Sequence, residues 1–205
     1  RRASLGIIRI IIENSLDIDL DYLIDLTEVN FDKADLRLFL KERVVYYLTE
    51  KKYQKKVVKA VVQQYKLDLL PILPRVIAEI TEFISTEAGK RVLAIYKRVS
   101  NFLSSNKEFL SFEKKFSKEL ATKADKLAKE QLTLTKQKVE ENLQCKDYKT
   151  ALSTLGSMVG SVNQFLDNVQ VNCEDNDLRR LRYSLLSQIR QTMDRVVVFS
   201  ELDKI

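Results

Sequence analysis

Cations are the side chains in this sequence whose type and spacing could do chemistry. The stretch from Ala88 to Lys107 carries five lysine and arginine residues and no aspartate or glutamate. On an α-helix, four of these cations and one amide fall on one side, beside an apolar stripe. This basic strip consists of Lys90, Arg91, Lys97, Arg98 and Asn101. Clustered cations repel one another, and a nucleic-acid phosphate backbone relieves that repulsion. A solvated helix face explains the strip equally well.

A second group of cations lies near the C-terminus. Arg179 and Arg182 are one helical turn apart and can present two guanidinium groups side by side to phosphates. Asp177 falls in the first turn of the same predicted helix, where the helix dipole favours a carboxylate. The alternative is that Asp177 and the arginines pair with neighbouring helices. The arginines of this segment are Arg179, Arg180, Arg182, Arg190 and Arg195.

Catalytic and metal chemistry finds little support in the sequence. The chain contains no histidine, which excludes histidine-based triads and most zinc and iron sites. Neither GxxxxGK[ST] nor GxGxxG occurs, so no phosphate-cradling loop is predicted. The paired carboxylates Asp17 with Asp19 and Glu174 with Asp175 are interpreted as helix starts rather than acid-base pairs. We therefore predict no catalytic residue, no metal site and no cofactor in this chain.

Two kinds of residue have competing structural interpretations. Tyr96, Tyr148 and Tyr183 could stack on unpaired bases, but a core position with a hydrated hydroxyl is the preferred interpretation. Gly156 and Gly160 stand four residues apart in a helical pattern. Close approach of two helices is the preferred explanation for that spacing, and a hinge is the alternative.

The composition predicts an all-α fold that positions these groups. The 205 residues are 45% apolar and 31% charged, which is typical of a globular protein. Only four glycines and two prolines interrupt the chain. Since β-hairpins need turn residues far more often, long helices are favoured.

Residues 1–85 are predicted to form a first helical region. Helical patterns fall at 3–14 (where the β-branched run of isoleucines would also suit a strand), at about 20–26 and at 34–50. The next helix is rich in lysine, with five lysines between Lys51 and Lys59, no acid among them and a valine stripe to bury. Pro71 and Pro74 start the following element.

Residues 86–205 are predicted to form a second part, an antiparallel helical bundle. The break at 85–89 sets the boundary between the two parts. Apolar stripes at helical spacing run through 90–104, 147–171 and 176–200, and 113–144 is a long, weakly amphipathic helix. Such stripes must cover one another, which a helical bundle achieves.

The general properties of the chain suggest a cytosolic setting. The formal net charge is +6, which indicates nucleic-acid binding only where the charge is clustered. The two cysteines, Cys145 and Cys173, are expected to be reduced thiols. The apolar run from Leu5 to Ile12 is too short to cross a bilayer, so no membrane partner and a cytoplasmic location are expected. A start at Arg1 rather than Met suggests a piece of a longer or processed protein.

The segment EDNDLRRLRYSLL, residues 174–186, resembles the signature of the DALR anticodon-binding domain, an all-helical bundle. Asp177, Leu178 and Arg179 occupy the positions of the motif from which the family takes its name, and Arg182 corresponds to a second arginine of the family pattern. Residues 94–103, 147–152 and 162–169 are similar to other segments of the domain. Two positions depart from the family: Leu181 replaces a usual asparagine, and Tyr96 replaces a small or amide residue.

Residues 1–13 resemble a stretch of the β subunits of bacterial glycyl-tRNA synthetases. This resemblance implies the tRNA-binding part of an aminoacyl-tRNA ligase, with no catalysis in the chain itself. The implied partners are glycine-accepting tRNA and an α subunit that binds ATP and magnesium, in a heterotetramer. It further implies that the basic strip, with Arg179, Arg182 and Arg190, holds the anticodon arm.

The sequence leaves three alternatives to this interpretation. The chain could be a helical scaffold for subunit assembly without RNA contact, or the equivalent domain of an arginyl-tRNA synthetase. The first half also resembles a helical region related to HD phosphohydrolases. The absence of histidine excludes metal-dependent hydrolysis of that kind.

Overall fold

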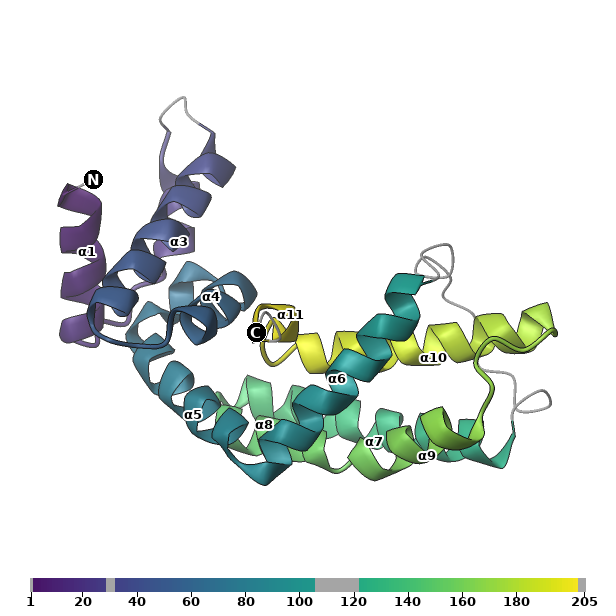
Figure 1. The fold of residues 1–205 in the computed structure, drawn as a ribbon. Helices are drawn as coiled ribbons and strands as arrows, with labels where there is room; N and C mark the ends of the chain where they lie inside the picture. Colours follow the sequence, from purple (N-terminus) through teal and green to yellow (C-terminus); the bar gives the residue numbers. More distant parts are fainter. Residues whose placement is uncertain (1, 29–31, 106–121, 203–205) are drawn as a thin grey trace. The chain divides into compact units, whose positions relative to one another are not determined.

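The computed structural model describes residues 2–28, 32–105 and 122–202, and every regular element among them is helical (Figure 1). The prediction of an all-α fold is confirmed. Contacts divide the chain into two compact units. The first unit runs to Thr81 and also takes the residues from Ser200 onward, and the second is Glu82–Phe199. The boundary between the two units therefore lies four residues before the boundary between residues 85 and 86 that the sequence predicts.

The first unit is built from short helices around a core of isoleucine, leucine and valine. The predicted helix at 3–14 is confirmed, and the strand alternative is wrong. Helix α3 contacts both α1 and α4, and η1 contacts α1 and α2. The elements are α1 (Arg2–Glu13), α2 (Leu20–Leu26), α3 (Lys33–Glu50), α4 (Lys55–Gln64), the 3-10 helix η1 (Leu67–Ile72), the first part of α5 (Leu73–Ser85) and most of α11 (Phe199–Leu202).

The second unit is a helical bundle. Helices α6 and α7 each contact α8, α9 and α10, so the stripes predicted from the sequence cover one another. Helices α7 and α8 are joined only by Cys145–Asp147, and so short a connection makes them antiparallel neighbours. The elements are α6 (Glu87–Ser105), α7 (Lys123–Gln144), α8 (Tyr148–Gly156), α9 (Val159–Asn168) and α10 (Asn176–Asp194). Of the predicted helix 113–144, residues 113–121 lie outside the described residues, as does Lys107.

Aspartates start several of these helices. The Asp19 carboxylate accepts the Tyr22 N–H at 2.9 Å, and Asp175 accepts those of Asp177 and Leu178 at 2.8 and 3.0 Å. Such caps satisfy backbone donors that have no partner inside the helix. The interpretation of the carboxylate pairs as helix starts is therefore confirmed for Asp19 and Asp175. Asp32 and Asp147 cap α3 and α8 in the same way.

The prediction for Gly156 and Gly160 is wrong. Among the described residues, a Cβ atom at either position would meet no atom of another helix within 4 Å, so no described helix approaches closely there. The single helix predicted over 147–171 is in fact two, because α8 ends at Gly156 and α9 begins at Val159. The close approach occurs instead at Gly89, where a Cβ would lie 2.0 Å from the Phe83 carbonyl oxygen. Glycine at position 89 thus permits the tight passage from α5 to α6.

The described residues also bear on the membrane and redox predictions. Within them, no helix combines the length and apolarity that a transmembrane span requires. Both Cys145 and Cys173 are free thiols.

Candidate nucleic-acid interface

Helix α6 separates an apolar face from a basic one. Its buried side carries Val92, Ile95, Val99 and Leu103, which pack into the core of the second unit. The basic strip lies on the other side, where all of its members are exposed except Arg98, which is half-buried. The shared face that helical spacing predicted is therefore present.

The first turn of α6 supplies one acid beside the strip. The Lys90 ammonium donates to the Glu87 carboxylate at 2.7 Å, with both side chains largely exposed. The hydrogen bond from Lys90 holds the pKa of Glu87 below its usual value. Because an exposed pair of this kind is weak, Lys90 stays available to a competing phosphate.

Arg98 is tied to a neighbouring helix. Its guanidinium donates to the Asn163 side-chain oxygen and to an Asp167 carboxylate oxygen, each at 2.6 Å. Both partners lie on α9, so Arg98 links α6 to α9. A phosphate at this position would have to share the guanidinium with Asp167.

The first turn of α10 carries the residues of the Asp177-Leu178-Arg179 signature. Asp177 is exposed, whereas Leu178 and Arg179 are half-buried. The Arg179 guanidinium donates to the side-chain oxygen of Asn176 in the same turn. Asp177 therefore stands in the first turn of the helix, as predicted.

Arg182 does not have the position that the sequence suggested. It is only 5% exposed, and its guanidinium forms hydrogen bonds of 3.2 and 3.3 Å with the fully buried carboxylate of Asp125 on α7. Its remaining terminal nitrogen donates to the Gln170 carbonyl at 2.9 Å. All of these contacts lie inside the bundle, so the prediction of direct RNA contact by Arg182 is corrected. Arg182 instead pairs with a neighbouring helix, which is the alternative that the sequence left open.

Asp125 has two roles in the same place. One of its oxygens accepts the Thr122 backbone N–H at 2.8 Å and the Thr122 hydroxyl at 2.7 Å, which completes a capping box at the start of α7. The carboxylate thus joins the start of α7 to α10. This link fixes the helix that carries Arg179.

The two predicted cation groups are not adjacent. Tyr96, next to the centre of the strip, donates to Asp194 at 3.4 Å near the end of α10. Arg179 lies fifteen residues before Asp194, or about 22 Å along the helix axis. Arg190 is closer to the strip, with its Nε atom 3.6 Å from the Asp194 carboxylate. The site is therefore an extended surface rather than a single cluster.

The three candidate tyrosines are core residues. Tyr96, Tyr148 and Tyr183 are each at most 3% exposed. The ring of Tyr96 stacks on Phe199, and the Tyr183 hydroxyl donates to Asn172 at 2.7 Å. The predicted core position of the three rings is confirmed, and base stacking on them is excluded in this conformation.

One cation of the second unit was not singled out from the sequence. Lys129 on α7 donates to the Gln188 side chain of α10 at 2.7 Å, and burial together with nearby Lys136 lowers its pKa. The sequence offered no signal, because Glu130 follows directly and the lysines of α7 alternate with acids. Lys129 therefore links α7 to α10.

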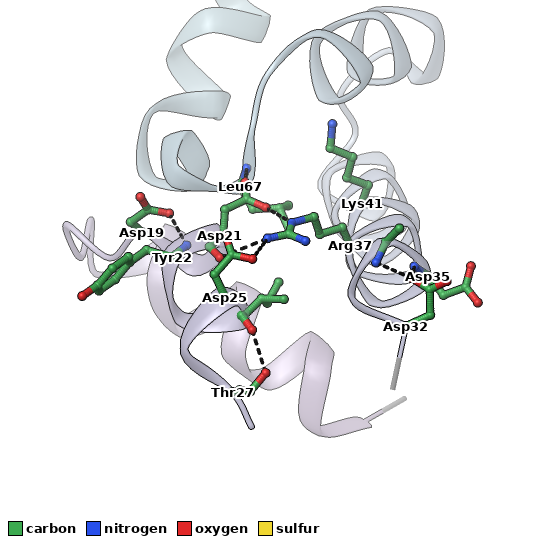
Figure 2. A network of polar contacts seen from close by, with 12 residues as sticks. Asp19, Asp21, Tyr22, Asp25, Thr27, Asp32, Asp35, Arg37, Lys41 and Leu67 are labelled. Carbon is green, nitrogen blue, oxygen red and sulfur yellow. Dashed lines mark hydrogen bonds and ion pairs between the residues drawn. The ribbon is translucent and has the colours of Figure 1, made fainter. Parts of the chain in front are cut away.

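A polar network occupies the first unit (Figure 2). The Arg37 guanidinium donates to Asp21 at 2.8 Å and to Asp25 at 2.6 Å, and the second Asp21 oxygen accepts the Leu67 N–H at 2.6 Å. Arg37 thereby joins α3 to α2, and Asp21 joins α2 to η1. Among the described residues, no three acid or cysteine side chains are grouped so that they could hold a metal ion. The network therefore has a structural role, because it links α2 to α3 and to η1.

Comparison with known proteins gives this arrangement a family. A family model described as "DALR anticodon binding domain" matches residues 92–197, more than half of the chain. The chain belongs to the DALR anticodon-binding domain family. The match runs from α6 to just past the end of α10, the helices that carry the basic strip and Arg179. A second model, described as "Glycyl-tRNA synthetase beta subunit", matches residues 1–63.

Similar curated proteins cover nearly the whole chain. The glycine–tRNA ligase β subunits of Rickettsia peacockii and Rickettsia typhi are 31% and 32% identical to it over 98% of its length. The β subunit of a Ruegeria species is 27% identical over 99%. The chain spans about three tenths of the length of these relatives. They are named for glycine, so the arginyl-tRNA synthetase alternative gains no support.

Proposed function

We propose that the second unit binds the anticodon arm of a tRNA through the exposed face of α6 and the first turn of α10. The observation that carries the proposal is the family match over residues 92–197, on the same helices that display the basic strip. Contacts are made mainly to phosphates, because lysine and arginine outnumber exposed aromatic side chains on this surface. Phosphate contacts fix position without reading sequence.

The wider setting follows from the relatives named glycine–tRNA ligase β subunits. In this proposal the chain serves ATP-dependent glycylation of a glycine-accepting tRNA in the cytoplasm. ATP and magnesium bind to an α subunit, with which the β subunit forms a heterotetramer. The chain itself contributes RNA binding and no cofactor, in keeping with its lack of histidine.

The candidate contacts differ in exposure. Arg91 and Lys97 are exposed at the centre of the strip, and Arg98 is half-buried and bound to Asp167. Arg179 stands at the far end of the surface, and the intervening length suits a segment of RNA rather than a single phosphate. Arg91 and Lys97 are therefore the side chains best placed to test the proposal.

The test compares two charge-neutralised variants of the full chain. Arg91→Gln/Lys97→Gln removes two strip cations, and Lys138→Gln/Lys149→Gln removes two exposed lysines on α7 and α8. Each phosphate contact contributes about 0.7–0.9 to the slope of log affinity against log salt. A filter-binding titration with tRNA at several salt concentrations should show the strip variant roughly tenfold weaker, with a slope shallower by about 1.5. Equal affinities of the two variants, both folded by circular dichroism, contradict the proposal.

One observation favours a second candidate function, that of a helical scaffold for subunit assembly. Ile10, Leu26 and Leu38 are each more than half exposed in the first unit, and exposed apolar side chains favour protein contact. A scaffold without RNA contact predicts no tRNA binding even at low salt. The same titration therefore distinguishes the two functions.

A further inference from the structure

The first unit carries a second basic segment, longer than the strip on α6. No aspartate or glutamate occurs between Glu50 and Asp68, and the intervening residues include six lysines. The segment runs from the end of α3 through α4 to the start of η1. Neither the anticodon-arm site nor the polar network around Arg37 uses these lysines.

Helix α4 sorts this segment into two faces. Val57, Val58 and Val61 are completely buried, while Lys55 and Lys59 are exposed four residues apart. Their attachment points are about 6 Å apart along the helix. Gln63 continues the line by one more turn. We call four exposed lysines of this segment the lysine ridge, leaving out Lys51 because it pairs with Glu13: Lys52, Lys55, Lys59 and Lys66.

Among the ridge lysines, Lys66 interacts electrostatically with Asp25 and Asp68. In the part of the chain that the structure describes, no ridge lysine has a carboxylate within 4 Å. Lys51, which is not part of the ridge, is by contrast held by Glu13 at 3.0 Å. The positive charge of the ridge therefore faces solvent.

Two hollows lie along the ridge and share one more lysine. A pocket of about 290 Å³ is lined by Lys41 and Lys59, and a neighbouring one of about 490 Å³ is lined by Lys41 and Lys66. The Lys41 ammonium donates a long hydrogen bond of 3.4 Å to the Gln63 carbonyl. Burial lowers the pKa of Lys41 and outweighs the opposing effect of Asp21. An anion in either hollow gains a half-buried cation as well as a ridge lysine.

The acids beside these hollows are already engaged. Asp21 and Asp25 both accept from Arg37, and Asp21 also accepts from the Leu67 backbone (Figure 2). Glu42, at the smaller pocket, lies 3.7 Å from the Arg43 guanidinium. Among the described residues here, cations without a carboxylate within 4 Å therefore dominate the surface.

The composition of the ridge favours a nucleic acid over a protein partner. Protein interfaces have apolar or aromatic centres and are depleted in lysine. Phosphate binding needs only accessible cations and releases counterions. The line from Lys55 through Lys59 to Gln63 contains no apolar side chain. An acidic protein bound there would meet positive charge but no apolar centre of the kind that protein interfaces have.

We propose that the lysine ridge is a second RNA-contacting surface, which binds phosphates of the tRNA outside the anticodon arm. The inference rests on the proposed function, since it takes tRNA as the nucleic acid. The ridge belongs to a different compact unit from the α6 surface. Variants of the ridge and of the basic strip can therefore be compared as changes to two separate units.

The test uses whole tRNA and a hairpin containing only its anticodon arm. For Lys55→Gln/Lys59→Gln in the full chain, affinity for whole tRNA should fall roughly tenfold at about 0.1 M salt, with the salt slope shallower by about 1.5. Affinity for the hairpin should stay unchanged. Lys55→Arg/Lys59→Arg keeps both charges and should keep both affinities.

The matched control is Arg9→Gln/Lys51→Gln. It removes the same charge from the same unit, but from side chains paired with Glu13, so it should bind whole tRNA like the unmodified chain. If a folded ridge variant keeps full affinity and slope for whole tRNA, the inference is overturned. It is also overturned if polyglutamate displaces tRNA from the ridge at equal charge concentration, because the ridge would then be an acidic-protein site.

Failure of the proposed function gives a different result. If the hairpin does not bind, or binds equally to the Arg91→Gln/Lys97→Gln variant, the anticodon-arm site is wrong. A ridge variant that still loses affinity for whole tRNA would support the ridge under those conditions.

Discussion

Arginines tie helices together in both units, and the units differ in the burial of the carboxylates that they reach: Asp125 in the second unit is fully buried, whereas Asp21 and Asp25 in the first keep 16% and 62% of their side chains exposed. In the second unit, arginines cross between helices: Arg98 reaches Asp167 on α9, and Arg182 reaches the buried Asp125 on α7. Arg195 likewise reaches Glu140 on α7. In the first unit, ion pairs gather around Glu13 and Arg37, and the lysines of α4 are left facing solvent.

The difference between these arginines and the lysines of α4 follows from the chemistry of the two cations. A guanidinium offers five donors in a rigid fork and can satisfy several acceptors at once, which suits a tie between helices. An ammonium group is compact and strongly hydrated, so a lysine stays on the surface unless an acid is near. The role of an arginine in this chain must therefore be assigned from its contacts in the structure, whereas a run of lysines in the sequence already indicates an exposed surface.

The largest expected effect comes from the buried tie. Asp125→Ala leaves the Arg182 guanidinium buried without its carboxylate and also removes one half of the capping box of α7, the hydrogen bond to the Thr122 backbone N–H. A buried charge that loses its partner typically costs about 3–5 kcal/mol. Urea unfolding should show that loss. Glu140→Ala, which breaks the exposed pair with Arg195, should cost less than about 1 kcal/mol, and equal losses in the two variants would refute the comparison.

The second largest effect is expected at Gly89, where the chain passes tightly from α5 to α6. Gly89→Ala places a Cβ against the Phe83 carbonyl and should destabilise the chain by about 1–3 kcal/mol through forced backbone movement. Gly156→Ala meets open space and should change the unfolding free energy by less than about 1 kcal/mol. Thermal melts of the two variants check this, and a Gly89 variant as stable as the Gly156 variant contradicts it.

Arg179 and Arg182 allow a direct comparison within one motif. Arg179→Gln should leave stability nearly unchanged and weaken tRNA binding about fivefold at about 0.1 M salt, as for one lost phosphate contact. Arg182→Gln should instead reduce the unfolding free energy, because Arg182 acts inside the bundle. Binding and melting measured on both variants would reject this division if Arg182→Gln melts like the unmodified chain.

The smallest effect concerns pH. Burial raises the pKa of Asp194, despite hydrogen bonds from Tyr96 and the Phe199 backbone. The folded chain therefore takes up this proton at a higher pH than the unfolded chain, and the penalty for the charged form disappears as pH falls through the raised pKa. Asp194→Asn is always neutral. Its stability relative to the unmodified chain should be highest at neutral pH and decline on acidification, and a pH-independent difference would contradict the assignment.

Helix positions and the basic strip were predictable from the sequence, because they depend on local periodicity. The lysine-rich helix α4 and the exposed face of α6 follow directly from the spacing of apolar residues. The burial of Arg182 was not predictable, since its partner Asp125 lies 57 positions away on α7. The prediction of close helix approach at the glycines was wrong for a related reason. Whether Gly156 or Gly89 faces the backbone of another segment depends on how the helices pack.

A footprint of the chain on tRNA tests the central claim most directly. Hydroxyl-radical cleavage of tRNA with and without the full chain reports which riboses become protected. Binding by the α6 and α10 surface predicts protection of the anticodon arm, lost in Arg91→Gln/Lys97→Gln and kept in Lys138→Gln/Lys149→Gln. An anticodon arm that stays fully cleaved under saturating protein contradicts the account.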